Sequence, residues 1–194
     1  MKKLPLEFYL SDNVLEIAKK LLGKILYTNI NGVITSGQIV ETEAYMGILD
    51  KASHAYNNRR TKRTEVMFSK GGLSYVYICY GMHFLLNVVT NIENIPDAVL
   101  IRALKPLQSI KIMKKRSNKN ENFCSGPALL SKSMGIDKSF NNVSFLSQRI
   151  WIEDNKDVDL KDIEASPRVG IDYAEEFRLK PWRFSIKPEK IKTI

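Results

Sequence analysis

One dipeptide constrains the fold of this chain more than any other feature of its sequence. Asn31-Gly32 separates two β-rich runs, which cover residues 24–30 and 33–45. Asparagine and glycine tolerate the positive φ angles of a type I′ turn, so the two runs are predicted to pair as an antiparallel hairpin. The chain is therefore expected to be built around an antiparallel sheet.

The remaining elements follow from the same kind of pattern. An amphipathic helix is predicted over residues 13–22, because Asn13 and Glu16 form a capping-box pair and apolar residues then recur at helical spacing. A second hairpin is predicted to turn at Gly81-Met82. Further strands are predicted at 73–80, 83–91, 97–104 and 182–186, and further helices from Leu107 to Arg116 and from Pro127 to Gly135. Helices beside a mostly antiparallel sheet indicate an α+β fold.

Two segments lack a clear periodic pattern. Residues 46–72 are polar and basic, with almost no large apolar side chain before Val66, and are predicted to form a long surface loop. Residues 153–164 are acidic, and the sequence gives no reason for that charge.

Length and composition narrow the class of protein. The 194 residues carry 30 Lys plus Arg against 21 Asp plus Glu, a net charge of +9, with no repeat or linker. We therefore expect a single compact domain over residues 1–194 that works as a monomer and has nucleic acid as its first candidate partner. Two cysteines, Cys79 and Cys124, suit a cytoplasmic protein with reduced thiols. No apolar run approaches the roughly 18 residues of a membrane span, so no membrane partner is expected.

The residues able to carry chemistry lie mainly between positions 41 and 102. Strand alternation brings Glu41, Glu43 and Tyr45 to one face at the end of the second strand. Five of the eight tyrosines fall in this part of the chain: Tyr45, Tyr56, Tyr75, Tyr77 and Tyr80. A tyrosine offers a flat apolar face and a polar rim, which suits a pocket for a heteroaromatic base.

Longer strings add a resemblance to a known family. IVETEAYMG at 39–47, YVYICYGMHFLLN at 75–87, VLIRALKPL at 99–107 and RVGIDYAEEFRLKPWRF at 168–184 occur in one order along nearly the whole chain. In these strings the chain resembles the alkyladenine (3-methyladenine) DNA glycosylases. The resemblance implies a monofunctional hydrolase of N-glycosyl bonds that flips alkylated or deaminated purines out of duplex DNA and starts base-excision repair. It implies no cofactor or metal, and a place in the cytoplasm or, in a bacterium, at the nucleoid.

The resemblance also implies roles for individual residues. Glu43 matches the general base, which activates a water to attack C1′ of the damaged nucleotide, and Arg102 matches the arginine that helps to hold this water. Tyr45 and Tyr77 match the two rings that stack on opposite faces of the flipped base.

Other positions match residues that select the base or insert into DNA. His54 matches a histidine of the pocket wall, and Asn87 matches a residue that excludes guanine. Tyr80 matches a side chain that wedges into the duplex, which implies a curved sheet with a protruding, DNA-inserting hairpin that also carries Met82. The basic residues of the loop are expected to follow the DNA backbone: Arg59, Arg60, Lys62 and Arg63.

The chemistry is consistent with these roles. Cleavage of the glycosidic bond leaves an oxocarbenium-like sugar, and a carboxylate can both stabilise this charge and take a proton from water. No lysine lies within IVETEAYMG or YVYICYGMHFLLN, the strings that supply most of the pocket residues, so a Schiff-base lyase step is not expected.

The residues alone leave two other functions open. The first is a non-catalytic nucleic-acid-binding module that presents Tyr75, Tyr77 and Tyr80 on a basic sheet. The second is a metal-dependent nuclease, which would use the side chains of Glu41, Glu43, Asp50 and His54 as ligands.

Overall fold

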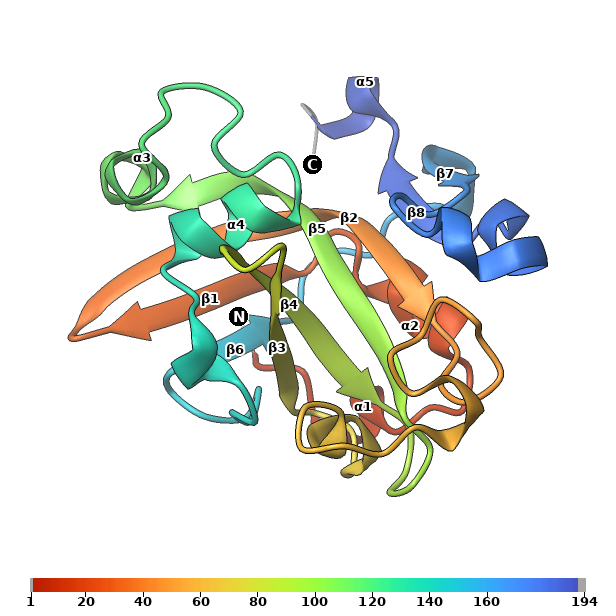
Figure 1. Ribbon diagram of the computed structural model, residues 1–194. Helices are drawn as coiled ribbons and strands as arrows, with labels where there is room; N and C mark the ends of the chain where they lie inside the picture. The colour runs from red at the N-terminus through yellow and green to blue at the C-terminus, as the bar shows by residue number, and fades with distance from the viewer. Residues whose placement is uncertain (1, 192–194) are drawn as a thin grey trace.

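An antiparallel sheet of eight strands forms the centre of the protein (Figure 1). This computed structural model describes residues 2–191. Six strands follow the order β3-β4-β5-β2-β1-β6, while β8 pairs with β2 and β7. The strands are β1 (Ile25–Ile30), β2 (Val33–Tyr45), β3 (Ser74–Cys79), β4 (His83–Thr90), β5 (Asp97–Gln108), β6 (Ile150–Glu153), β7 (Ile163–Ser166) and β8 (Arg183–Ile186).

The first hairpin forms as its turn residues predict. Asn31 and Gly32 have φ angles of 52° and 82°, and Ile30 pairs with Val33. The long strand β2 then changes partner along one edge: β1 pairs with its first half and β8 with residues 41–43, while β5 follows its other edge. Register shifts around Glu41 mark irregular pairing at this point, where bulges bend a strand.

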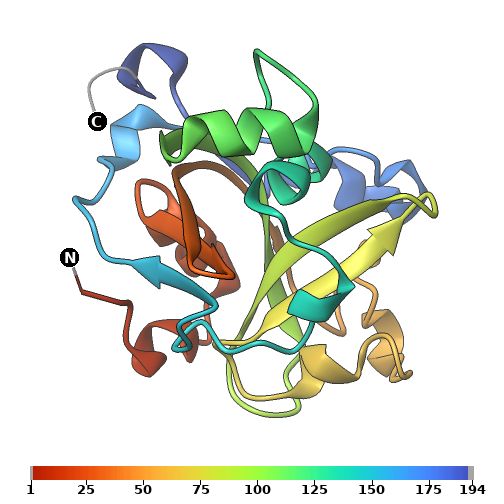
Figure 2. The same ribbon diagram turned by 90° about the vertical axis from the view of Figure 1, so that its left-hand side faces the viewer.

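Helices cover parts of this sheet. They are α1 (Leu6–Tyr9), α2 (Val14–Leu21), α3 (Ile110–Ser117), α4 (Pro127–Met134) and α5 (Pro188–Ile191). The side chain of Asn13 accepts a hydrogen bond from the Glu16 N–H at 3.1 Å, which confirms the predicted start of α2. Figure 2 shows α3 and α4 side by side above the sheet. The α+β prediction is confirmed.

Two predicted boundaries are wrong. The helix predicted from Leu107 begins instead at Ile110, because β5 continues to Gln108 in register with Ser36 of β2. Strand pairing here outweighs the helical spacing of the apolar residues.

The second boundary concerns the β3–β4 turn. It is centred on Tyr80-Gly81 rather than on Gly81-Met82, since Tyr80 and Gly81 have φ angles of 49° and 70° and Cys79 pairs with His83. A positive φ is uncommon for a bulky side chain. The turn therefore holds Tyr80 itself at the tip of the hairpin.

The segment 46–72 is less of a surface loop than predicted. It contains two short 3-10 helices, η1 (Tyr56–Asn58) and η2 (Glu65–Phe68), and further 3-10 turns occur at 138–140, 160–162 and 172–179. Val66, Met67 and Phe68 are buried in a cluster with Tyr75 of β3. The apolar side chains at the end of the segment therefore fold it back onto the sheet.

The acidic stretch has a structural partner. The ammonium group of Lys24 is almost completely buried and lies 2.7 Å from a carboxylate oxygen of Asp154 and 2.6 Å from one of Asp157. The two carboxylates compensate a buried charge that would otherwise be costly. Within residues 2–191, no helix has both the length and the apolar composition required to cross a membrane.

Candidate active site

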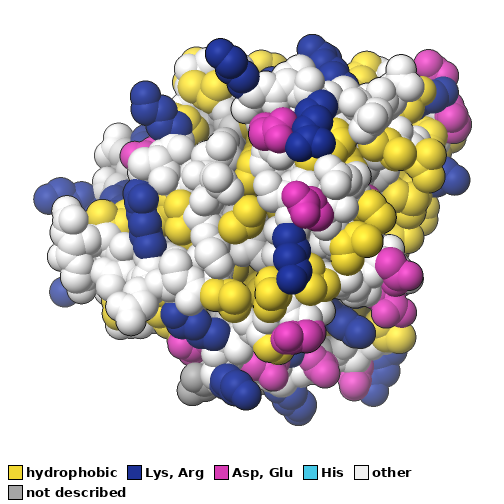
Figure 3. Space-filling view, turned by 90° about the horizontal axis from the view of Figure 1, so that it is seen from below, with side chains coloured by type: hydrophobic (Ala, Val, Ile, Leu, Met, Phe, Trp, Pro, Cys, Tyr) yellow, Lys and Arg dark blue, Asp and Glu magenta, His cyan; other side chains and the backbone are white. Residues whose placement is uncertain are grey.

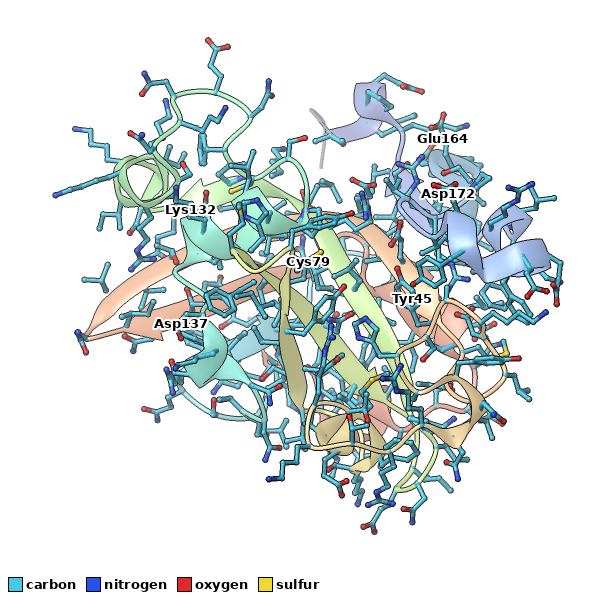
Figure 4. All side chains as sticks on the ribbon, viewed as in Figure 1. Tyr45, Cys79, Lys132, Asp137, Glu164 and Asp172 are labelled. Carbon is cyan, nitrogen blue, oxygen red and sulfur yellow. The ribbon has the colours of Figure 1, made fainter. Side chains whose placement is uncertain are left out.

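A cavity of about 580 Å³ lies where β2, β3, β4 and β5 meet the loop 46–72 and the segment 169–173. Figure 4 shows Tyr45 and Cys79, two of the lining residues, on either side of β5. The cavity brings together most of the predicted site: Glu43, Tyr45, His54, Tyr77, Asn87 and Arg102 all line it.

Glu43 is completely buried at the wall of this cavity. Its Oε1 accepts a hydrogen bond from the Val169 N–H at 2.8 Å and lies 3.2 Å from Nη1 of Arg102. Its Oε2 accepts a hydrogen bond from the Tyr45 hydroxyl at 2.8 Å. Three donors thus fix the carboxylate and stabilise its charge in a buried place.

Arg102 joins the two glutamates of β2. Its Nε donates to Oε1 of Glu41 at 2.9 Å, while its Nη1 faces Glu43. Glu41 also contacts Nη1 of Arg183 at 3.1 Å. Strand alternation therefore places both carboxylates on one side, as predicted, but the two differ in environment: Glu43 is fully buried and Glu41 is bound by two guanidinium groups.

Tyr45 forms one wall of the cavity. The Arg168 guanidinium carbon lies 4.6 Å from the centroid of its ring. Burial, and then the neighbouring charge of Glu43, raise the pKa of Tyr45 well above its usual value. The phenol therefore stays protonated and keeps donating to Glu43.

Arg168 is the centre of a group of buried hydrogen bonds that the sequence did not reveal, and we call this group the Asp50–Arg168 clamp. Its guanidinium forms two hydrogen bonds with the carboxylate of Asp50, one of them from Nη2 to Oδ1 at 2.9 Å, and Nη1 also donates to the Ala44 carbonyl at 2.8 Å. Both charged side chains are fully buried. The clamp ties the end of β2 to the start of the loop and to the segment that supplies Val169.

His54 and two tyrosines of β3, Tyr75 and Tyr77, form another part of the cavity wall. His54 Nδ1 is 2.8 Å from the Tyr75 hydroxyl oxygen, and the His54 and Tyr77 ring centroids are 4.6 Å apart. Burial, together with the positive charges of Arg63 and Arg59, lowers the pKa of His54 to about 4. His54 is therefore neutral at neutral pH.

Asn87 of β4 also lines the cavity. On the sheet, Leu100 of β5 pairs with Asn87 on one side and with Glu43 on the other. The buried Asn87 amide nitrogen donates to the Tyr75 carbonyl at 3.1 Å, which fixes the side chain's orientation.

The hairpin tip lies at the edge of the molecule (Figure 2). Tyr80 and Met82 are 87% and 69% exposed, high values for large apolar side chains, and Tyr80 reaches the rim of the cavity. The tip thus presents a ring and a thioether to whatever approaches the cavity.

The four basic residues of the loop differ in placement. All four are exposed, but their contacts differ. Arg60 pairs with Glu65 at 2.7 Å and donates to the Asn94 side chain. Arg63 instead turns towards the cavity, with its guanidinium carbon 5.0 Å from the centroid of the Tyr77 ring.

The side chains proposed for a nuclease do not converge. Asp50 is held by Arg168, Glu41 by Arg102 and Arg183, and the ring of His54 by Tyr75. In the part of the chain from residue 2 to residue 191, no group of three His, Cys, Asp or Glu is placed to hold a metal ion.

Sequence reasoning also missed other residues of the cavity wall, namely Val169, Ile171, Tyr173, Pro127 and Ala128. The first three belong to the string 168–184 that carries part of the family resemblance, but no local pattern links them to Glu43. Pairing of β8 with residues 41–43 of β2 brings the segment to the site.

Comparisons with known proteins find relatives that match nearly the whole chain. A family model described as "Methylpurine-DNA glycosylase (MPG)" matches residues 7–190. A protein of Chlamydia felis named "Putative 3-methyladenine DNA glycosylase" is 47% identical over 195 residues, which cover 98% of this chain and 100% of the relative. Proteins with the same name from Clostridium perfringens (strain SM101) and Clostridium acetobutylicum are 46% and 43% identical. These alignments cover 95% and 97% of this chain, and 95% and 96% of the respective relatives.

Proposed function

The chain belongs to the methylpurine-DNA glycosylase family, and from this premise we propose that it excises alkylated or deaminated purines from duplex DNA. The reaction is hydrolysis of the N-glycosyl bond, and the abasic product enters base-excision repair. The observation that carries the proposal is a fully buried carboxylate, Glu43, fixed by three donors at the wall of a cavity lined with tyrosines.

A base inside a duplex cannot reach this cavity unless its nucleotide is extruded. Tyr45 of β2 and Tyr77 of β3 both line the cavity, and in this proposal they stack on the two faces of the extruded base. Stacking offsets part of the cost of unpairing and unstacking. The residues proposed to bind the base all come from one chain, and we propose that the enzyme works as a monomer in the cytoplasm or at the nucleoid.

Glu43 acts as the general base in this proposal. A water beside Glu43 and Arg102 would attack C1′, and the carboxylate would take its proton while it stabilises the positive charge that develops on the sugar. Among the described residues, the lining of the cavity includes no lysine. This supports water as the nucleophile rather than an amine that forms a Schiff base.

Of the four basic loop residues expected to follow the DNA backbone, Arg59, Arg60 and Lys62 keep this role in the proposal, whereas Arg63 lines the cavity. Net charge alone does not locate this contact, because Lys and Arg are interspersed with Asp and Glu on the face seen in Figure 3. The loop is favoured since it connects the strands that carry the pocket residues and so runs close to the cavity.

An assay of alkali-labile sites tests the proposed function. Duplexes that contain hypoxanthine or 7-methylguanine should acquire such sites on incubation with the protein, equally with and without a chelator. A binding module would shift the duplex in a gel and leave no such sites. Activity that the chelator abolishes would support a metal-dependent nuclease.

Tyr80 is expected to wedge into the duplex. Replacement by alanine should lower the extruded population for every lesion and weaken lesion binding by about 1 to 3 kcal/mol, because the ring would no longer fill the space that the nucleotide vacates. A fluorescent base analogue opposite the lesion reports extrusion directly. Tyr56→Ala, at another exposed tyrosine, serves as the control, and an unchanged signal in Tyr80→Ala would remove the proposed role.

Asn87 is expected to exclude guanine through a clash with its amino group. Because the Asn87 amide is held by the Tyr75 carbonyl, it cannot easily turn away, and specificity then depends on repulsion. Asn87→Ser should increase excision of 7-methylguanine relative to hypoxanthine in single-turnover assays. A uniform loss on both substrates would instead make Asn87 a structural residue.

A further inference from the structure

Arg63 and Arg102 line the base pocket, and Arg168 lies behind the ring of Tyr45 in its wall. The three arginines differ in how their charge is balanced. Arg102 pairs with Glu41 and Glu43, and Arg168 pairs with Asp50. Arg63 forms no ion pair with any carboxylate of residues 2–191. One uncompensated positive charge therefore lies at the pocket.

The contacts of Arg63 place this charge where a base is expected to stack. Its guanidinium carbon is 5.0 Å from the centroid of the Tyr77 ring, and its Nη2 is 3.4 Å from Nε2 of His54. The same guanidinium also borders a second cavity of about 320 Å³ beside the pocket, so it remains open to solvent on that side.

These contacts determine which ring nitrogen of His54 carries the hydrogen. A guanidinium can only donate, so Nε2 of His54 must accept, and Nδ1 carries the hydrogen and donates to the Tyr75 hydroxyl. Burial first, and then the charges of Arg63 and Arg59, lower the pKa of His54 to about 4. The lowered pKa of His54 indicates that the surroundings of this wall disfavour an additional positive charge.

Purine substrates of the proposed enzyme fall into two classes of charge. A purine nucleotide alkylated on a ring nitrogen, such as N7 of guanine, carries a positive charge, whereas deamination of adenine gives the neutral base hypoxanthine. A cationic base stacked on Tyr77 would lie beside Arg63 and be repelled, while a neutral base would not. The negative charge of Glu43 attracts a cation, but Arg102 largely balances it.

We propose that Arg63 is a specificity-determining residue that disfavours cationic alkylated purines relative to neutral deaminated purines. The inference rests on the proposed function and adds a ranking of substrate classes to it. Arg168, although it contacts the ring of Tyr45, plays no such role because Asp50 neutralises it.

The test compares the single-turnover excision of 7-methylguanine and hypoxanthine by Arg63→Gln. The ratio of the two rates, 7-methylguanine over hypoxanthine, should rise on the order of tenfold, as expected when one charge at stacking distance in a partly solvated site is removed. Arg63→Lys keeps the charge and should give a ratio near that of the wild type. Lys70→Gln removes an exposed charge from the same loop, outside the lining of both cavities, and should leave the ratio unchanged.

A second readout does not depend on activity. Titration of His54 by NMR should show a higher pKa in Arg63→Gln than in the wild type, and a pKa close to the wild-type value in Arg63→Lys. The proposal is overturned if the excision ratio stays constant in Arg63→Gln, or if both rates fall in proportion. Failure of the wild type to release either base would overturn the proposed function itself, which separates the two failures.

Discussion

Glu43→Gln should reduce the single-turnover rate of base excision by about 10²- to 10⁴-fold, while affinity for the lesion duplex stays near the wild-type value. Glutamine keeps the shape of the side chain: its carbonyl oxygen can still accept a hydrogen bond from the Val169 N–H, while its amide nitrogen would donate to the Tyr45 hydroxyl oxygen. It cannot take a proton from water or balance a cationic sugar. Quenched-flow or manual time courses with excess enzyme measure the rate, and a gel-shift titration measures the affinity.

Glu41→Gln is the matched control for this substitution. Glu41 lies two residues away on the same strand and contacts the same arginine, but it does not line the cavity. Its loss should slow excision far less, because Arg102 would still be held by Glu43. Equal losses in the two variants, or a larger loss for Glu41→Gln, would show that Glu43 is not the general base.

Asp50→Asn should lower the free energy of unfolding by about 3 to 5 kcal/mol, since it leaves the buried guanidinium of Arg168 without its counter-charge. Both side chains are fully buried, so water cannot take over the lost interaction. Urea unfolding followed by tryptophan fluorescence measures the change, and Trp182, whose ring lies 5.0 Å from the Arg168 guanidinium carbon, is close enough to report it.

Two comparisons separate the buried pair from other effects. The double variant Asp50→Asn with Arg168→Met removes both charges and should be less destabilised than the sum of the single variants. Glu65→Gln breaks the exposed pair with Arg60 and should change unfolding much less. Additive losses for Asp50 and Arg168 would show that the pair is not coupled as described.

Local sequence patterns were sufficient to predict much of the fold. The Asn31-Gly32 turn and the cap of α2 formed as predicted, because each depends on residues close in sequence. The error at Leu107 has the opposite cause. Leu107 lies in a strand rather than a helix because this end of β5 pairs with β2, more than 70 residues earlier in the chain. The local spacing of apolar residues carries no information about that pairing.

In the candidate site, too, local features were predictable from the sequence and long-range contacts were not. The alternation of Glu41, Glu43 and Tyr45 on one strand was readable, but the donors that make Glu43 a fixed, buried carboxylate come partly from Val169, 126 positions away. The Asp50–Arg168 clamp spans 118 positions. No periodicity connects residues at such separations, and charge alone could not show that Arg63 faces the pocket while Arg60 binds Glu65.

The most direct test of the account is a product balance for a single lesion. A duplex with one hypoxanthine is incubated with excess protein, the free base is quantified by chromatography, and strand integrity is measured before and after alkali. We expect one free base for each alkali-labile site, an intact strand before alkali, and almost no product with Glu43→Gln over the same time. Strand breaks without alkali, or bound duplex with no free base, would contradict hydrolysis of the glycosidic bond by this site.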